Sequence, residues 1–290
     1  MAQPTRDQSP SDGRARGSEA QASRRRLQSI AGIAVIAVLV IVAGIAISTS
    51  GGDSAARKSG AVSHGAIHTP MIIAIDHTVA AELAGIPEQG SVLGNPSARV
   101  TLQYFGDLQC PICADFTTGN DDGLPGTSDG GLPQFISAQV RSGEVKIIYR
   151  SICSATCSSS NPAPGGGSSA FTRQQVAALA AGAQGRLWYF IETFYREQGV
   201  EDSGYVTAAF INNVARQIPG LNLSSWAAAR RGGAYYGYVK ELISDAHRAA
   251  SVRINATPAL VMHGPRGTIL VNGGNFAGYN ELMSAYKEVS

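Results

Sequence analysis

The chain has 290 residues, of which 44% are hydrophobic and 15% are charged. This balance excludes a wholly disordered protein and leaves room for one substantial folded domain with appended segments. The formal net charge is +2, but six arginines and three acidic residues precede Ile30, so the rest of the chain carries a net charge of −1. The main part of the chain therefore has no basic excess of the kind that favours binding to nucleic acid.

The N-terminal part of the chain divides into two segments of opposite character. Residues 1–29 are rich in serine, glutamine, arginine and glycine and have almost no aliphatic side chains. They are predicted to form a disordered cytoplasmic tail, because such a segment cannot bury a core. Residues 30–47 carry no charge and consist of Ile, Val, Ala, Leu and Gly. We expect a transmembrane anchor over residues 30–48, since a run of this length is at the short end of what crosses a membrane.

Basic residues flank only one end of this apolar run. Arg24, Arg25 and Arg26 directly precede it, whereas the first basic residues after it are Arg57 and Lys58. The positive-inside rule predicts a single-pass protein of the cell membrane with a cytoplasmic N-terminus and the rest of the chain outside. A cleaved signal peptide is the alternative, although its apolar core would be only about 7–15 residues long. All four cysteines follow the run, on the side of the membrane where disulfides persist.

Residues 49–85 are predicted to form an extracytoplasmic linker. Up to about residue 70 they include Ser-Gly stretches typical of a flexible tether. The apolar run from Met71 to Ile75 fits a short strand or a segment that packs onto the folded domain. The folded domain itself is expected to begin near Ile86 and to span residues 86–290.

Within that domain the spacing of apolar residues predicts mixed α/β structure. Strands are expected at residues 100–105, 145–149, 259–262 and 268–271, a helix at 134–140, and a helical block at about 170–252. Residues 119–131 have a loop composition that ends the helix before them.

A C-x-x-C pair, Cys110 and Cys113, follows the first of these strands. If a helix opens at this point, the first cysteine receives the unpaired N–H groups and the positive dipole end of that helix, which favour thiolate over thiol. Pro111 suits the first helical turn because it has no N–H to lose and its φ is already helical. The pattern indicates thiol–disulfide exchange, with Cys110 as the nucleophile and Cys113 as the resolving thiol.

A second motif, Thr257-Pro258, opens the predicted hairpin at residues 259–271. With the stretches 94–100, 105–113 and 256–260, the sequence resembles the thioredoxin-fold thiol oxidoreductases, and within them the DsbA-like proteins. The resemblance implies an α/β thioredoxin-like fold with a helical insertion. It also implies that the Thr257–Pro258 bond is cis, faces the C-x-x-C pair and belongs to a loop that binds substrate.

The resemblance implies partners as well. These are exported proteins with cysteine thiols and a membrane protein that re-oxidises the pair, either DsbB-like or related to vitamin K epoxide reductase. No cofactor is expected.

Two further cysteines, Cys153 and Cys157, leave several interpretations open. Four cysteines in two closely spaced pairs resemble a structural zinc site. We expect no metal, because the order of strand, C-x-x-C and helix and the Thr-Pro hairpin favour redox chemistry. On a helical turn, positions i and i+4 share a face and a disulfide is within reach. Such a disulfide could be structural or could relay electrons as a second redox pair, and free or intermolecular thiols are the remaining alternative.

Two residues near the C-x-x-C pair bear on its chemistry. Asp107 could accept the proton of Cys113 if it is partly buried, or it could act as a turn or N-cap residue. Ile112, between the two cysteines, offers only apolar contact, whereas a cation there would stabilise the thiolate. We therefore expect a reduction potential between that of thioredoxin, about −270 mV, and that of DsbA, about −120 mV.

Three functions compete at this point. The first is an extracytoplasmic thiol–disulfide oxidoreductase that introduces disulfides into exported proteins. The second is a reductase or isomerase on the same fold, although the separate dimerisation domain usual in isomerases is not visible in the sequence. The third is a binding module of thioredoxin fold whose disulfides are only structural.

Overall fold

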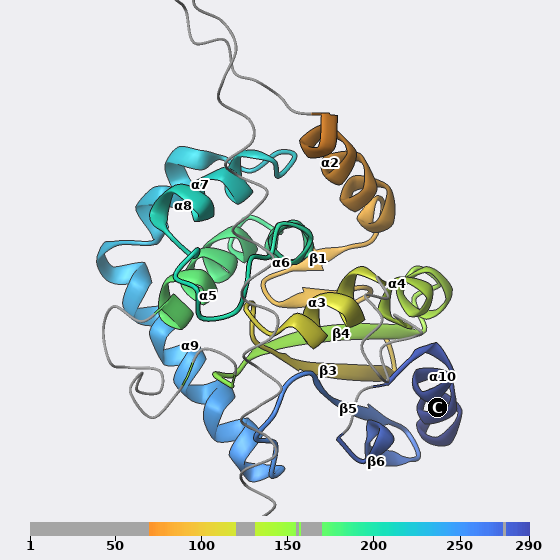
Figure 1. Ribbon diagram of the computed structural model, residues 1–290. Helices are drawn as coiled ribbons and strands as arrows, with labels where there is room; N and C mark the ends of the chain where they lie inside the picture. The colour runs from red at the N-terminus through yellow and green to blue at the C-terminus, as the bar shows by residue number, and fades with distance from the viewer. Residues whose placement is uncertain (1–69, 120–130, 155–156, 158–169, 275–276) are drawn as a thin grey trace, which may run out of the picture. The chain divides into compact units, whose positions relative to one another are not determined.

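The computed structural model describes residues 70–119, 131–154, 157, 170–274 and 277–290 (Figure 1). The predicted tail at 1–29 and the predicted anchor at 30–48 lie outside these residues. Among the residues described, no helix is long and apolar enough to cross a membrane. All of them belong to one unit, Gly65–Ser290.

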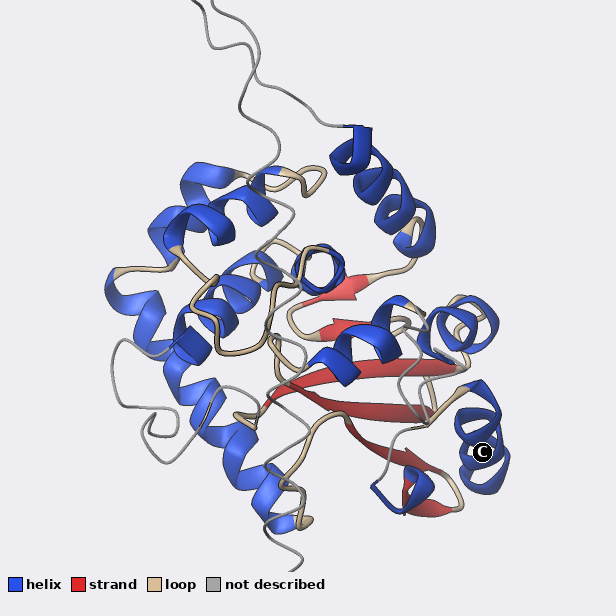
Figure 2. Cartoon of the chain, in the orientation of Figure 1, coloured by secondary structure: helices blue, strands red, loops and turns tan. Residues whose placement is uncertain are grey.

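A six-stranded sheet runs through this unit in the order β1-β2-β4-β3-β5-β6 (Figure 2). The strands are β1 (Glu88–Gln89), β2 (Val92–Leu93), β3 (Val100–Gly106), β4 (Val145–Ser151), β5 (Ala259–Gly264) and β6 (Gly267–Leu270). The central strands β3 and β4 are parallel, and the other neighbouring pairs are antiparallel. The carboxyl ends of β3 and β4 therefore meet at one edge of the sheet, and both pairs of cysteines follow these ends.

Helices connect and cover the strands. Before and between the central strands lie α2 (Pro70–Leu83), α3 (Pro111–Thr118) and α4 (Gly131–Phe135), which continues as the π-helix η1 (Ile136–Val140). Between β4 and β5 lie α5 (Ala170–Gly182), α6 (Leu187–Arg196), α7 (Ala208–Arg216), α8 (Leu223–Ala229) and α9 (Gly232–Ser251). After β6 come the 3₁₀ turn η2 (Val271–Gly274) and α10 (Tyr279–Val289). In Figure 1, α5, α7, α8 and α9 lie on the left, and α6 is seen end-on beside β1.

One face of the sheet carries the main core. In the parallel register Leu102 lies opposite Ile147 and Tyr104 lies opposite Tyr149, so these side chains share a face. All four are almost fully buried. The ring of Phe116 on α3 packs edge-on against Tyr104, with centroids 5.2 Å apart. The helix that carries the C-x-x-C pair is thereby fixed against the strand that precedes it.

The opposite face is partly covered by the C-terminal half of α9. A smaller cluster there joins Phe105, Ile152, Ala249, Ile254, Ala259 and Val261. Asp245 on α9 accepts the backbone N–H of Ser151 at 2.9 Å and pairs with Arg150 at 3.2 Å. The carboxyl end of β4 is thus tied to the longest helix of the inserted block.

Helix α2 differs from the expectation for the linker. The run from Met71 to Ile75 lies in this helix, so the short-strand alternative is wrong, whereas Ile75 packs against the main core, as the other alternative expects. Val79 and Leu83 are buried in the main core, so the folded unit begins before residue 86. A short apolar run does not distinguish strand from helix, and Pro70 at the first helical position favours the helix. Packing against α6, where Arg196 pairs with Glu82 at 2.9 Å, decides the outcome.

Candidate active site

Cys110 forms the N-cap of α3, as the sequence predicts. Its backbone is extended (φ −71°, ψ 117°), and its Sγ accepts the backbone N–H of Cys113 at 3.4 Å. Pro111 occupies the first turn. The helix ends after eight residues at Gly119, whose φ of +71° lies in the left-handed region that glycine tolerates. The backbone N–H of Cys113, in the first turn of α3, therefore points at the sulfur of Cys110.

The two thiols of the C-x-x-C pair occupy unequal environments. Both are free thiols; Cys110 is 6% exposed and Cys113 is fully buried. A hydrogen bond with the Cys113 side chain lowers the pKa of Cys110, with further help from Thr257 and the Cys113 backbone, against the opposing effects of burial and of the charge on Asp107. Burial raises the pKa of Cys113 well above its ordinary value. A negative charge on this pair therefore resides on Cys110.

Thr257 and Pro258 lie across from the N-terminus of α3. Strand β5 begins at Ala259, opposite Phe105 of β3, so the two residues before it reach the carboxyl end of β3. The Thr257–Pro258 peptide bond is cis, as the resemblance implies. The thiol of Cys110 donates to the backbone oxygen of Thr257 at 3.3 Å. The structure thus brings the C-x-x-C pair and the Thr-Pro loop into direct contact.

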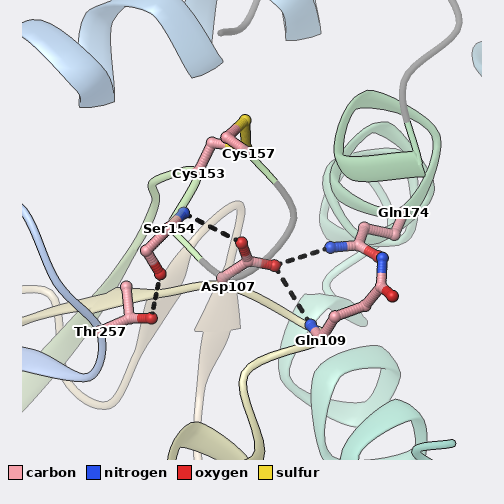
Figure 3. The surroundings of a disulfide bond; sticks show 7 residues. All are labelled: Asp107, Gln109, Cys153, Ser154, Cys157, Gln174 and Thr257. Atoms are coloured by element: carbon pink, nitrogen blue, oxygen red, sulfur yellow. Dashed lines mark hydrogen bonds between the residues drawn. A yellow bond between two sulfur atoms is a disulfide. The ribbon is translucent and has the colours of Figure 1, made fainter. Parts of the chain in front are cut away.

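Asp107 lies in the turn between β3 and α3 and is fully buried. Its Oδ1 accepts the backbone N–H of Gln109 at 3.1 Å and the side-chain Nε2 of Gln174 at 3.0 Å. Its Oδ2 accepts the backbone N–H of Ser154 at 3.1 Å (Figure 3). The first of these bonds gives Asp107 a turn role. Its role as proton acceptor for Cys113 stays a prediction.

Several polar residues around this site were not predicted from the sequence. Gln109 and Gln174 are buried and bond to each other at 3.2 Å, and Gln198 donates to the backbone oxygens of Leu108 and Cys110. The signal available for Gln174 is a glutamine inside an apolar helical segment, since a buried amide needs a partner. For Ser154 we find no comparable signal in the sequence.

A cluster of tyrosines lies beneath Cys113. The hydroxyl of Tyr104 lies 2.9 Å from Thr117 Oγ1, 3.4 Å from the Tyr195 hydroxyl and 3.4 Å from the backbone oxygen of Cys113. The hydroxyl of Tyr195 donates to the backbone oxygen of Asp107 at 3.2 Å. Burial raises the pKa of both tyrosines well above the ordinary value, so they are neutral hydrogen-bonding groups. They fix the backbone on both sides of the C-x-x-C pair.

Cys153 and Cys157 are joined in a disulfide with their Cα atoms 5.4 Å apart. The alternative of free thiols does not hold, and the zinc interpretation loses two of its four thiolate ligands. Among the residues that the structure describes, no group of three or more His, Cys, Asp or Glu side chains could hold a metal ion. Its structural role and its role as an electron relay both stay predictions.

The fold of the chain is similar to that of known protein structures. The chain matches 96% of the length of BdbD from Bacillus subtilis (oxidised) over 70% of its own length, with 18% identity and a TM-score of 0.51. It matches 92% of α-DsbA1 from Wolbachia pipientis over 71% of its own length, with 11% identity and a TM-score of 0.50. None of the curated proteins matches the sequence.

At this level of identity the likeness shows a shared fold, and the fold confirms the predicted α/β architecture with a helical insertion between β4 and β5. The family model for thioredoxin matches residues 87–268. This match spans β1 to the start of β6, including the C-x-x-C pair and the Thr-Pro loop. Because the match covers more than half of the chain, the protein belongs to the thioredoxin family.

Proposed function

We propose that this protein is a thiol–disulfide oxidoreductase that introduces disulfides into exported proteins. The observation that carries the proposal is the inequality of Cys110 and Cys113. Cys110 caps α3 and has a lowered pKa, whereas Cys113 is sealed beneath it and has a raised pKa. A stabilised thiolate at Cys110 favours the reduced form of the pair, and this makes the oxidised form a better oxidant.

The reaction begins with the oxidised pair. A substrate thiolate attacks Sγ of Cys110, the Cys110–Cys113 bond breaks, and Cys113 leaves with the electron pair and takes up a proton. A second substrate thiolate then attacks the substrate sulfur of the mixed disulfide, and Cys110 leaves as a thiolate. The substrate has lost two electrons and two protons, and the Cys110–Cys113 pair has gained the two electrons. The lowered pKa of Cys110 makes it a good leaving group in this last step.

Two features of the site support binding of an extended substrate segment. Thr257 and Pro258 border Cys110, and Pro258 has no N–H that competes for a partner. A substrate strand lying along this loop would place its cysteine beside Cys110 with its backbone groups paired, as in other cases of strand addition.

The cycle requires a re-oxidising partner, which must remove two electrons from the reduced pair. We propose a membrane protein of the DsbB-like or vitamin K epoxide reductase-like kind, with the apolar run at 30–48 anchoring the chain beside it. The charge asymmetry around that run supports an extracytoplasmic position for the folded domain. Protease added to intact spheroplasts should then digest the domain and spare the tail. Release of a soluble form lacking about the first 48 residues would instead support a cleaved signal.

Trapping of a mixed disulfide tests the reaction directly. Cys113→Ala, with Cys110 first converted to a mixed disulfide with glutathione, should accumulate a mixed disulfide with a substrate protein that has a single thiol. The substrate thiolate displaces glutathione from Cys110, and neither Cys113 nor a second substrate thiol is present to resolve the product. Cys110→Ala should accumulate none. The matched control is Cys153→Ala/Cys157→Ala, which should trap nothing and should keep its activity within about tenfold of the wild type. A Cys110→Ala variant that oxidises a reduced model protein at the wild-type rate would remove the proposed reaction.

The net direction of electron flow is tested by the reduction potential of the Cys110–Cys113 pair. A value above that of thioredoxin, about −270 mV, supports oxidation of substrates. A value at or below it would favour the reductase alternative on the same fold. A Cys110 that resists a small alkylating agent after mild reduction would favour the binding module.

A further inference from the structure

The loop after β4 contacts the active site from the side opposite to α3. Cys153 begins the loop two residues after the end of β4, and Ser154 follows it directly. Figure 3 shows Ser154 between the carboxylate of Asp107 and the side chain of Thr257, with the disulfide of Cys153 and Cys157 above it in this view. Ser154 is the point at which three parts of the site meet: the turn before α3, the Thr-Pro loop and the second disulfide.

Ser154 is held in place from two sides. Its backbone N–H donates to Oδ2 of Asp107 at 3.1 Å, and that carboxylate is itself fixed by the backbone of Gln109 and the side chain of Gln174. On its other side Ser154 is bonded to Cys153, whose sulfur is tied to Cys157. A buried carboxylate with three donors is costly to move, because each lost partner leaves a desolvated group.

The hydroxyl of Ser154 contacts the hydroxyl of Thr257. Each hydroxyl has one proton to donate and lone pairs to accept with. If Ser154 donates to Thr257, the proton of Thr257 is available for the sulfur of Cys110. Hydrogen bonding by the Thr257 side chain lowers the pKa of Cys110. In a chain of hydrogen bonds from the Ser154 hydroxyl through the Thr257 hydroxyl to the Cys110 sulfur, each bond would strengthen the next by polarisation.

We propose that Ser154, fixed by the Cys153–Cys157 disulfide and by Asp107, is a positioning residue that orients Thr257 toward the thiolate of Cys110. This rests on the proposed function only in assigning Cys110 as the reactive sulfur. It gives the second disulfide a role that differs from a relay, because no electrons pass through it. The disulfide sets the position of Ser154, and Ser154 sets the hydrogen bonding of the thiolate.

Ser154 has two opposing effects on the pKa of Cys110, and the larger of the two determines whether loss of its hydroxyl raises or lowers that pKa. Ser154 supports Thr257, which stabilises the thiolate, and it also supports the charge on Asp107, which destabilises the thiolate. The backbone oxygen of Thr257 accepts the Cys110 thiol at 3.3 Å, which places Thr257 beside the sulfur, and hydrogen bonding by the Thr257 side chain affects the pKa of Cys110 more than the charge on Asp107 does. Loss of the Ser154 hydroxyl leaves its backbone bond to Asp107 in place. Ser154→Ala should therefore raise the pKa of Cys110.

The test measures the pH dependence of Cys110 alkylation in the reduced full-length protein, assigned to Cys110 by peptide mass mapping. Ser154→Ala should leave roughly two- to tenfold less thiolate at a pH below the pKa, the size of one net hydrogen bond. Ser154→Thr, which keeps the hydroxyl, should restore the wild-type titration. Ser142→Ala, an exposed serine in the turn before β4, is the matched control and should change nothing.

A second measurement separates this role from a purely structural one. The equilibrium of the Cys110–Cys113 pair with glutathione should shift toward the disulfide by the same factor in Ser154→Ala, because the thiolate of the reduced form is less stable. Cys153→Ala/Cys157→Ala should shift both readouts in the same direction. An unchanged titration in Ser154→Ala, or a shift toward lower pH, overturns the inference. If Ser154→Ala shifts the Cys110 titration as expected but the wild-type protein does not oxidise substrates, the proposed function is overturned and this inference stands.

Discussion

The two pairs of cysteines follow neighbouring parallel strands, yet the fold treats them differently. Cys110 and Cys113 follow β3 and open a helix, so the first sulfur accepts a backbone N–H of that helix and the second is buried beneath it. Cys153 and Cys157 follow β4 and close a short loop as a disulfide. The spacing between two cysteines does not by itself decide their chemistry. What decides it is whether the backbone around one sulfur stabilises a negative charge more than the backbone around the other.

The largest difference between the pairs should be seen in activity. Cys110→Ala should reduce the oxidation of a reduced model protein to the uncatalysed rate, a loss on the order of 100-fold or more. Cys153→Ala/Cys157→Ala should keep the activity within about tenfold, because it changes only hydrogen bonding around Cys110. Refolding of a reduced disulfide protein measures both rates. If Cys153→Ala/Cys157→Ala folds normally but cannot oxidise substrate through repeated cycles, the second pair is a relay and the comparison fails.

Within the first pair, the two thiols should differ strongly in reactivity. Alkylation proceeds through the thiolate, so it rises with pH through the pKa of each sulfur. The lowered pKa of Cys110 moves its rise to a pH below that of an ordinary thiol, and the raised pKa of Cys113 moves its rise above it. At neutral pH the ratio of rates should be on the order of 100-fold in favour of Cys110. Peptide mapping after timed alkylation of the reduced protein measures it, and equal rates would contradict the asymmetry.

The second pair should matter mainly for stability. Its covalent loop is short, so chain entropy gives a stabilisation of about 2 kcal/mol, less than the roughly 3 kcal/mol of a 15-residue loop. Urea unfolding of Cys153→Ala/Cys157→Ala should show this loss, with Ser142→Ala as a neutral control. A loss much larger than this would mean that the loop carries more of the fold than its contacts with Asp107 and Thr257 indicate.

The smallest expected effect concerns the residue between the two reactive cysteines. Ile112 is half-buried and packs against the main core, so it offers no charge to the thiolate. Ile112→His would place a partly cationic ring near Cys110 and should raise the reduction potential by roughly 20–30 mV, about 1 kcal/mol. Ile112→Val should leave the potential unchanged. Equilibration with glutathione measures both, and an unchanged value for Ile112→His would mean that the side chain at position 112 does not contribute to the potential.

Much of this architecture was accessible from the sequence because it depends on local patterns. The C-x-x-C pair before a helix, the strands around it and the Thr-Pro hairpin each have a signature within about ten residues. The inserted helical block was predicted at about 170–252, and α5 to α9 span residues 170–251. Helix α2 was missed because its apolar run fits a strand equally well until packing against α6 is known.

The polar contacts around Cys110 could not be predicted from local sequence patterns. Gln174 lies 67 residues from Asp107, and Ser154 lies 103 residues from Thr257, so these contacts exist only once the sheet and the inserted block have come together. Hydrophobic periodicity indicates which face of a helix is buried, but it does not indicate which polar group will find a partner there.

The bond between Asp245 and the backbone of Ser151 has a mechanical consequence. This carboxylate on α9 holds the N–H of Ser151, two residues before Cys153, and pairs with Arg150. Opening the helical block away from the sheet at this point would leave a buried donor and a buried carboxylate without partners, at a cost of about 1–3 kcal/mol for each group. These contacts therefore resist hinge motion between the helical block and the sheet at the carboxyl end of β4, which the second disulfide follows. A substrate that approaches Cys110 from the end of β4 would therefore meet a rigid part of the molecule.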